Sequence, residues 1–144
     1  SLMGSLVHIE VPGEPKPWQV FIRRGPPPTG YLAYKGYQMD IQIRAKKKWG
    51  RRPLLENIPI EVRLKFFRSY PNRLPKKPGL HQQRAIEALC RKPDVDNLVK
   101  AAIDGIKGIV FKDDNMVVKV TAEKSFSEKP HTTIEVLDAK VTML

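Results

Sequence analysis

Apolar and polar residues alternate in four segments of the chain, which is the pattern of strands with one face in a core. The alternation is clearest over residues 60–66, and it recurs over residues 7–11, 116–122 and 134–136. Pro-Gly follows the first of these segments and Glu-Lys-Pro precedes the last, both typical of turns. The alternating apolar side chains are Val7, Ile9, Val11, Ile60, Val62, Leu64, Phe66, Met116, Val118, Val120, Ala122, Ile134 and Val136, and in the segment over residues 60–66 they are expected to face the core.

Helical periodicity predicts two amphipathic helices, and composition favours a third. The first covers residues 35–49, where an apolar side chain recurs at every fourth position from residue 37. The second covers residues 97–107, with Asp96 as its N-terminal cap and Gly108 in a left-handed turn at its end. Residues 80–90 have helical composition and are expected to form a short helix.

The order of these elements is typical of an α+β domain. We expect one mixed or antiparallel sheet with helices packed mainly on one face, joined by irregular proline-rich segments at residues 14–30 and 71–78. A chain of 144 residues fits one domain, which we assign to residues 6–144. Residues 1–5 are interpreted as a cloning remnant around an initiator Met3.

The charge of the chain indicates what kind of partner it binds. The chain has 26 Lys and Arg against 15 Asp and Glu, a formal net charge of +11, which favours DNA, RNA or an anionic membrane surface. No apolar run approaches the roughly 20 residues of a membrane span, so no membrane partner is expected. The single cysteine, Cys90, excludes an internal disulfide and a cysteine zinc site and indicates a reducing compartment. We therefore expect a cytoplasmic protein.

Four aspartates gather around the predicted helix at residues 97–107. Asp94 and Asp96 stand at its start, where both carboxylates can point to one side, and Asp113 and Asp114 stand in the turn after it. One of the latter can fold back if the next strand lies beside the helix entrance. Converging carboxylates repel one another unless a cation binds, and Mg²⁺ prefers such oxygen ligands. Carboxylates in a basic chain thus indicate metal-dependent phosphodiester hydrolysis.

Lys100 lies one helical turn after Asp96, where it could stabilise charge on a scissile phosphate or leaving group. The alternative is structural: Asp96 as a cap contributes about 1 kcal/mol and an Asp96–Lys100 pair a few tenths. Asp104, one further turn along, is interpreted as a surface acid that pairs with Lys100. At this point both the catalytic and the structural interpretations are open.

Residues 92–106, Lys-Pro-Asp-Val-Asp-Asn-Leu-Val-Lys-Ala-Ala-Ile-Asp-Gly-Ile, and residues 110–117, Val-Phe-Lys-Asp-Asp-Asn-Met-Val, resemble the RusA family of Holliday junction resolvases. The loop after the first strand and residues 124–130 resemble the ends of the family more weakly. The resemblance implies a homodimeric, Mg²⁺-dependent endonuclease, mostly phage- or prophage-borne, with Mn²⁺ as a substitute metal. It would nick opposing strands of branched DNA, a four-way junction, in recombination and repair, without an organic cofactor.

The resemblance also implies roles for individual residues. Asp94 and Asp96 match the paired aspartates of the family, Lys100 matches its catalytic lysine, and Asp114 matches its remaining essential aspartate. The expected metal ligands are then Asp94, Asp96 and Asp114, with Asp113 as the alternative to its neighbour. Every catalytic position has the expected residue type.

Basic and aromatic residues outside this motif are candidates for DNA contacts that sense shape. The basic candidates are Lys46, Lys47, Lys48, Arg51, Arg73, Lys76 and Lys77. Trp18, Phe67 or Tyr70 could wedge between bases at a branch point, although aromatic residues more often pack in cores. Two other functions stay open: a non-catalytic module for branched or single-stranded DNA, and a flap or branch nuclease of broader specificity.

Overall fold

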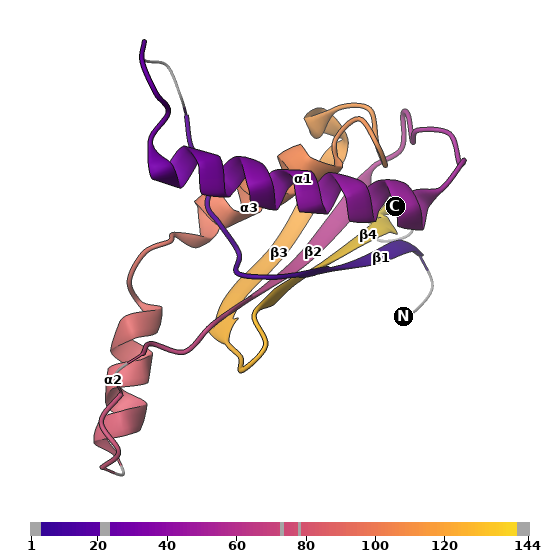
Figure 1. Cartoon of the computed structure of the whole chain (residues 1–144). Coiled ribbons are helices and arrows are strands. Elements are labelled where there is room, and N and C mark those ends of the chain that lie inside the picture. Colours follow the sequence, from indigo (N-terminus) through magenta and orange to yellow (C-terminus); the bar gives the residue numbers. More distant parts are fainter. Residues whose placement is uncertain (1–3, 21–23, 73, 78, 141–144) are drawn as a thin grey trace.

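A single four-stranded sheet organises the computed structural model (Figure 1), whose described residues are 4–20, 24–72, 74–77 and 79–140. The elements are β1 (Ser5–Pro12), α1 (Thr29–Trp49), β2 (Ile60–Arg68), α2 (Leu80–Leu89), α3 (Val95–Ile106), a 3₁₀ turn η1 (Asp114–Met116), β3 (Val117–Phe126) and β4 (His131–Asp138). The strand order is β1-β4-β2-β3. Because β4 is antiparallel to β1 and β2 while β3 is parallel to β2, the sheet is mixed, as predicted.

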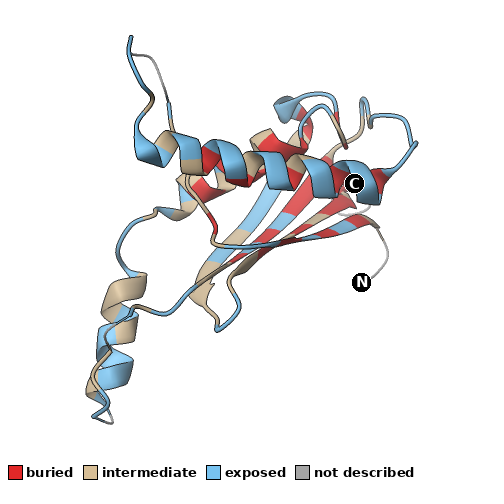
Figure 2. Ribbon diagram, in the orientation of Figure 1, coloured by how far each residue is buried: buried red, intermediate tan, exposed pale blue. Residues whose placement is uncertain are grey.

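The helices α1 and α3 lie across the same face of the sheet, and the buried side chains lie between these layers (Figures 1 and 2). The alternating apolar residues of β1, β2 and β4 are buried on this face, as the sequence pattern predicts. Gly105 permits close helix packing, since a Cβ atom there would lie 2.6 Å from Cγ2 of Ile41 in α1. The predicted α+β architecture, with helices mainly on one face, is confirmed.

The helix α2 differs from the other two because none of its residues is buried. It extends away from the sheet at the end of the proline-rich connector, where Figure 1 shows it separated from α1 and α3. Ile86 in the middle of this helix is 64% exposed. The predicted short helix at residues 80–90 is confirmed, and it forms an arm that projects from the body of the domain.

Two details of the fold were not predicted from the sequence. The helix α1 begins at Thr29 and not at residue 35, directly after Pro28 in the N-cap position. The strand predicted from Met116 to Ala122 forms as β3, but its alternating residues Val118 and Val120 are 48% and 42% exposed. The physical reason is that β3 is an edge strand: β2 pairs with one side of it, and the helices leave much of its core-side face uncovered.

Candidate active site

The apolar face of α3 decides which side chains the helix presents to solvent. Its buried residues are Leu98, Ala101, Ala102, Gly105 and Ile106. Burial of this stripe against the sheet and α1 leaves Asp96 and Lys100 exposed on the opposite side. The helix therefore displays the two residues one turn apart, as the sequence predicts.

The N-terminal cap of α3 lies two residues earlier than predicted. Asp94 occupies the N-cap position, because its carbonyl oxygen accepts the first helical hydrogen bond from Leu98 N–H at 3.2 Å. Neither Asp94 nor Asp96 makes a side-chain cap, so the prediction that Asp96 caps the helix is wrong. Asp96 lies in the first helical turn, where a negative charge interacts favourably with the helix dipole.

Two basic side chains hold the segment that leads into Asp94. Lys124 Nζ donates to the carbonyl oxygens of Arg91 at 2.8 Å and Pro93 at 2.9 Å. Arg68 donates through a terminal guanidinium nitrogen to the carbonyl oxygen of Lys92 at 3.2 Å. Three consecutive carbonyl groups before Asp94 are therefore bound by cations, and we call Arg68 and Lys124 the carbonyl clamp.

The clamp depends on the register of two parallel neighbours, β2 and β3. Phe66 of β2 is opposite Lys124 of β3, and Arg68 is opposite Phe126, so the two cations stand close together at the end of the sheet. Sequence reasoning missed both residues. The available signal was that Lys124 begins one of the segments that resemble the RusA family.

The N-terminal proline-rich loop completes the wall of the site. Glu14 accepts a hydrogen bond from Ser69 N–H at 3.1 Å and lies 3.5 Å from Nε of Arg68 in an ion pair. Further along the loop, Trp18 N–H donates to the carbonyl oxygen of Asn97 at 3.0 Å. These contacts tie the loop both to the carbonyl clamp and to the first turn of α3.

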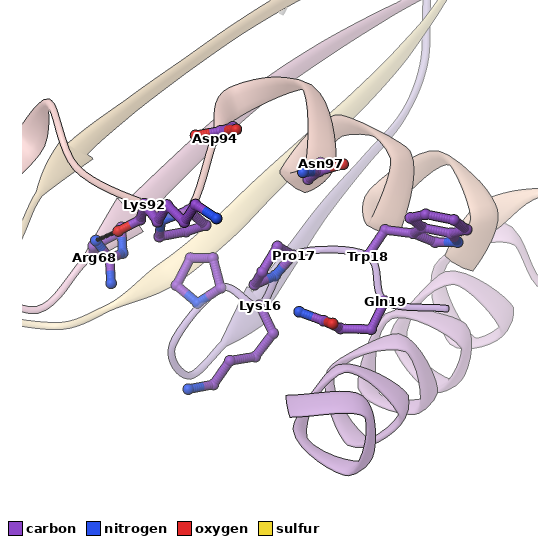
Figure 3. Close-up of a pocket in the computed structure, with 10 residues that line it drawn as sticks. Lys16, Pro17, Trp18, Gln19, Arg68, Lys92, Asp94 and Asn97 are labelled. Carbon is purple, nitrogen blue, oxygen red and sulfur yellow. Dashed lines mark hydrogen bonds between the residues drawn. The ribbon is translucent and has the colours of Figure 1, made fainter. Parts of the chain in front are cut away.

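A cavity of about 350 Å³ opens between this loop and the start of α3 (Figure 3). Its lining includes Lys16, Trp18, Gln19, Arg68, Lys92, Asp94 and Asn97. Figure 3 shows the Trp18 indole against α3, and Lys100 Nζ lies 3.7 Å from the centre of this ring. Asp94 thus lines a cavity that also has basic residues in its wall. Lys100 lies at the side of this cavity formed by Trp18.

Asp94 and Asp96 are both exposed, and within the described part of the chain neither carboxylate has a hydrogen bond or an ion pair. Two free carboxylates two residues apart provide the hard oxygen donors that suit Mg²⁺, which usually binds through one or two carboxylates and retains several waters. The donor set at the start of α3 therefore fits this metal.

Asp113 and Asp114 lie at the other end of α3. Asp114 begins η1, and its Oδ2 is 3.3 Å from Nζ of Lys107, the residue that follows the helix. The helix has 12 residues, so its ends are about 18 Å apart. Among the described residues no group of three or more His, Cys, Asp and Glu side chains could hold a metal ion. One chain does not bring Asp114 to Asp94 and Asp96, because the turn after α3 stays at the exit of the helix.

Asp104 faces the Asp114 end of α3. Burial, and then the negative charge of Asp114, raise the pKa of the Asp104 carboxyl above its ordinary value, while the charges of Lys107 and Lys100 partly oppose this. The predicted pair with Lys100 does not form, because none of the ion pairs in the described residues joins them and Lys100 lies on Trp18 instead.

Comparison with known families supplies the decisive observation. Residues 12–137 match the family described as endodeoxyribonuclease RusA, and this range covers most of the chain, including the carbonyl clamp and all four aspartates. The chain belongs to the RusA endodeoxyribonuclease family. Its mixed sheet, with α1 and α3 on one face, is thus the fold of a RusA-family domain.

A curated relative has no described activity. The chain is 31% identical over 78 residues to "Uncharacterized protein YqaN" from Bacillus subtilis (strain 168). The match covers 53% of this chain and 55% of the relative, so it spans about half the length of that protein. This relative supports kinship with a bacterial protein and says nothing of activity or substrate.

The predicted DNA contacts of this RusA-family chain lie in two separate places. Lys46, Lys47 and Lys48 are exposed in the last turn of α1, and Arg51 is exposed just after it. Lys47 and Lys48 also line a cavity of about 460 Å³ with His8, Glu10 and Arg44. Lys76 and Lys77 are exposed in the connector that leads to α2, and Arg73 lies outside the described residues.

Figure 1 shows the end of α1 and the start of α2, which lies at the free end of the α2 arm, at opposite ends of the molecule. The two basic groups therefore stand on either side of the acidic motif of α3, in positions suited to separate stretches of DNA backbone. The helices of the described residues include none that is long and apolar enough to cross a lipid bilayer.

Proposed function

We propose that this RusA-family chain is a Mg²⁺-dependent endodeoxyribonuclease that resolves four-way DNA junctions by paired nicks in recombination and repair. The observation that supports it most is the pair of exposed, unpartnered carboxylates of Asp94 and Asp96 in a chain of net charge +11. Such a pair repels the phosphates that the rest of the surface attracts, unless a cation binds between protein and DNA. The proposed place of action is the cytoplasm of a bacterial cell, with a phage or prophage as the source.

The residues of the proposed site have different roles in phosphodiester hydrolysis. Asp94 and Asp96 would hold Mg²⁺ or Mn²⁺, and a metal bound there would polarise the phosphoryl oxygen and activate a water molecule. Lys100, one turn further along the exposed face of α3, stabilises negative charge on the scissile phosphate or on the leaving oxygen. Arg68 and Lys124 fix the backbone that carries Asp94, so that little reorganisation is needed when the substrate binds.

Asp114 requires a second copy of the chain in this proposal. About 18 Å separates the two ends of α3, so Asp114 cannot share a metal with Asp94 and Asp96 of the same chain. In a two-fold symmetric homodimer, however, the exit of one α3 can meet the entrance of the other. Such a dimer has two active sites, which matches the need to nick two opposing strands.

Cleavage of labelled DNA tests the proposal. A synthetic four-way junction, a flap and a linear duplex of matched sequence would be incubated with and without Mg²⁺ at equal concentrations. We expect symmetric nicks in the junction only, and only with metal. Tight binding without nicks would instead favour the non-catalytic module, and equal cutting of flap and junction would favour a nuclease of broader specificity.

A further inference from the structure

Lys100 has three candidate partners, and the structure selects one of them. Asp96 lies one helical turn before it and Asp104 one turn after it, both within the usual reach of a helical ion pair. In the described residues neither carboxylate forms an ion pair with Lys100. The ammonium group lies over the indole of Trp18 instead, with Nζ 3.7 Å from the ring centre.

Trp18 is well held for this contact. Its backbone N–H donates to the carbonyl oxygen of Asn97, one turn before Lys100 on α3, at 3.0 Å. The side chain is half-buried and packs against the core, and the same loop is tied to β2 through the Glu14–Arg68 ion pair. The indole is therefore a fixed surface, whereas a lysine side chain alone has four flexible bonds.

We propose that Trp18 is the positioning residue for Lys100, a role that rests on the proposed function of that lysine. A cation over an aromatic face keeps its full charge, and indole is the best of the aromatic side chains for this contact. An ion pair with Asp96 would instead neutralise both partners. By holding Lys100 on the ring, Trp18 keeps the lysine charged for the phosphate and leaves the Asp96 carboxylate free for the metal.

The same geometry bears on the alternative role of Trp18 as a wedge between bases. A wedge must present a free ring to the DNA. Lys100 covers one face of this ring, and the loop holds the indole against α3 (Figure 3). Positioning of the lysine accounts for these contacts, and a wedge does not.

A double-mutant cycle tests this positioning role with single-turnover cleavage of the four-way junction in Mg²⁺ at saturating enzyme. Lys100→Ala is expected to slow cleavage about 100-fold, the scale of one missing electrostatic group. Trp18→Leu should slow it about tenfold through misplacement of the lysine, while Trp18→Phe, which keeps an aromatic face, should retain most of the rate. Added to Lys100→Ala, Trp18→Leu should have no further effect, because its role acts through that lysine.

Controls separate positioning from folding and binding. Lys35→Ala is a control for the loss of a cation–aromatic contact, because Lys35 of α1 lies over the ring of Tyr34 at 5.9 Å and is not one of the proposed site residues. It should leave the rate unchanged. Circular dichroism and the Kd for the junction should be close to those of the parent for every variant. If Trp18→Leu does not fold, Trp18→Met, which keeps an unbranched apolar side chain of some bulk, takes its place in the cycle.

The outcomes distinguish this proposal from the proposed function. A normal rate for Trp18→Leu with a slow Lys100→Ala would overturn the positioning role and leave the nuclease proposal intact. Equal slowing by Trp18→Leu in both backgrounds would also overturn it, as would weaker junction binding with unchanged chemistry, the result expected of a wedge. A normal rate for Lys100→Ala would remove the catalytic role of the lysine itself, and the positioning role with it.

Discussion

Lys124 places its ammonium nitrogen 2.9 Å from the carbonyl oxygen of Pro93, the residue immediately before Asp94. The second acceptor of the same nitrogen is the carbonyl oxygen of Arg91 at 2.8 Å. A strand at the edge of the sheet thus fixes the backbone at the entrance of α3. The position of the Asp94 carboxylate therefore depends on a residue thirty positions later in the chain.

Lys124→Met keeps most of the side-chain stem and removes the charge, so it leaves both carbonyl groups without this donor. We expect the free energy of unfolding to fall by about 1.5–3 kcal/mol, the scale of hydrogen bonds to a charged group. Displacement of Asp94 should also raise the Mg²⁺ concentration for half-maximal cleavage by about tenfold, as removal of support behind a metal ligand does. Denaturant unfolding and a metal titration of the cleavage rate measure the two effects. Lys129→Met in the exposed turn before β4 is the control, and an unchanged metal requirement in Lys124→Met would argue against the clamp.

Mixing two inactive variants tests whether the metal site is shared between copies. In a mixed dimer of Asp94→Asn and Asp114→Asn, one site lacks both carboxylates and the other is intact if each site combines the two chains. We therefore expect neither variant to cleave alone and the mixture to recover single nicks, with up to half of the dimers active. Nicking of a supercoiled substrate measures this recovery. Absence of activity in the mixture, with mixed dimers shown to form, would place all ligands in one chain. Activity of Asp114→Asn together with inactivity of Asp113→Asn would exchange the roles of these neighbours.

Asp104 predicts a dependence of stability on pH. Because the pKa of its carboxyl is raised, the folded state binds this proton more tightly than the unfolded state. Stability is therefore lost as the pH rises from the ordinary pKa of 3.8 through the raised value, and the loss persists at neutral pH. Asp104→Asn cannot lose a proton, so it should raise the Tm at pH 7 and give little difference below pH 3.8. Asp40→Asn on the exposed side of α1 is the comparison, and a lower Tm at pH 7 for Asp104→Asn would refute the argument.

The basic end of α1 predicts the salt dependence of DNA binding. Replacing Lys47 and Lys48 by Gln should weaken junction binding and reduce the slope of log Kd against log salt by about 0.9 for each phosphate that the protein no longer neutralises. The same replacements at Lys76 and Lys77 test the free end of the α2 arm, where the helix begins. Lys65→Gln, on the strand face that carries no helix, is the control for net charge. If the slope of log Kd against log salt stays the same in both double variants, these four lysines do not contact DNA phosphates.

Local patterns predicted the elements of this fold well and its contacts less well. The alternation over residues 60–66 identified β2 because a central strand buries one complete face. The same alternation failed at Val118 and Val120, because a sequence period does not tell a central strand from an edge strand. Pro28 hid the start of α1, since a proline is compatible with both a loop and the entry of a helix.

In the candidate site, too, the sequence predicted neighbouring residues but not the contacts between distant segments. Asp94, Asp96 and Lys100 are neighbours in the sequence, and their motif and spacing marked them without a structure. Trp18 and Lys124 approach that motif from segments 82 and 31 residues away, respectively, from the residues they touch. Their contacts arise from the sheet register and the loop path, which have no periodic signal. The sequence also did not show that Asp114 lies far from Asp94 and Asp96, because closeness in residue number does not imply closeness in space.

Linearisation of a supercoiled plasmid that extrudes a cruciform, which is a four-way junction, measures paired nicking directly. Paired nicks within the lifetime of one complex convert this plasmid to the linear form, whereas a single nick gives the open circle. We predict linear product only with Mg²⁺, none from a plasmid without the cruciform, and none from Asp96→Asn, which should still bind the junction as tightly or more tightly because a repulsive charge is removed. Linear product from Asp96→Asn at the parent rate, or no product from the parent protein with Mg²⁺ or Mn²⁺, would contradict the account.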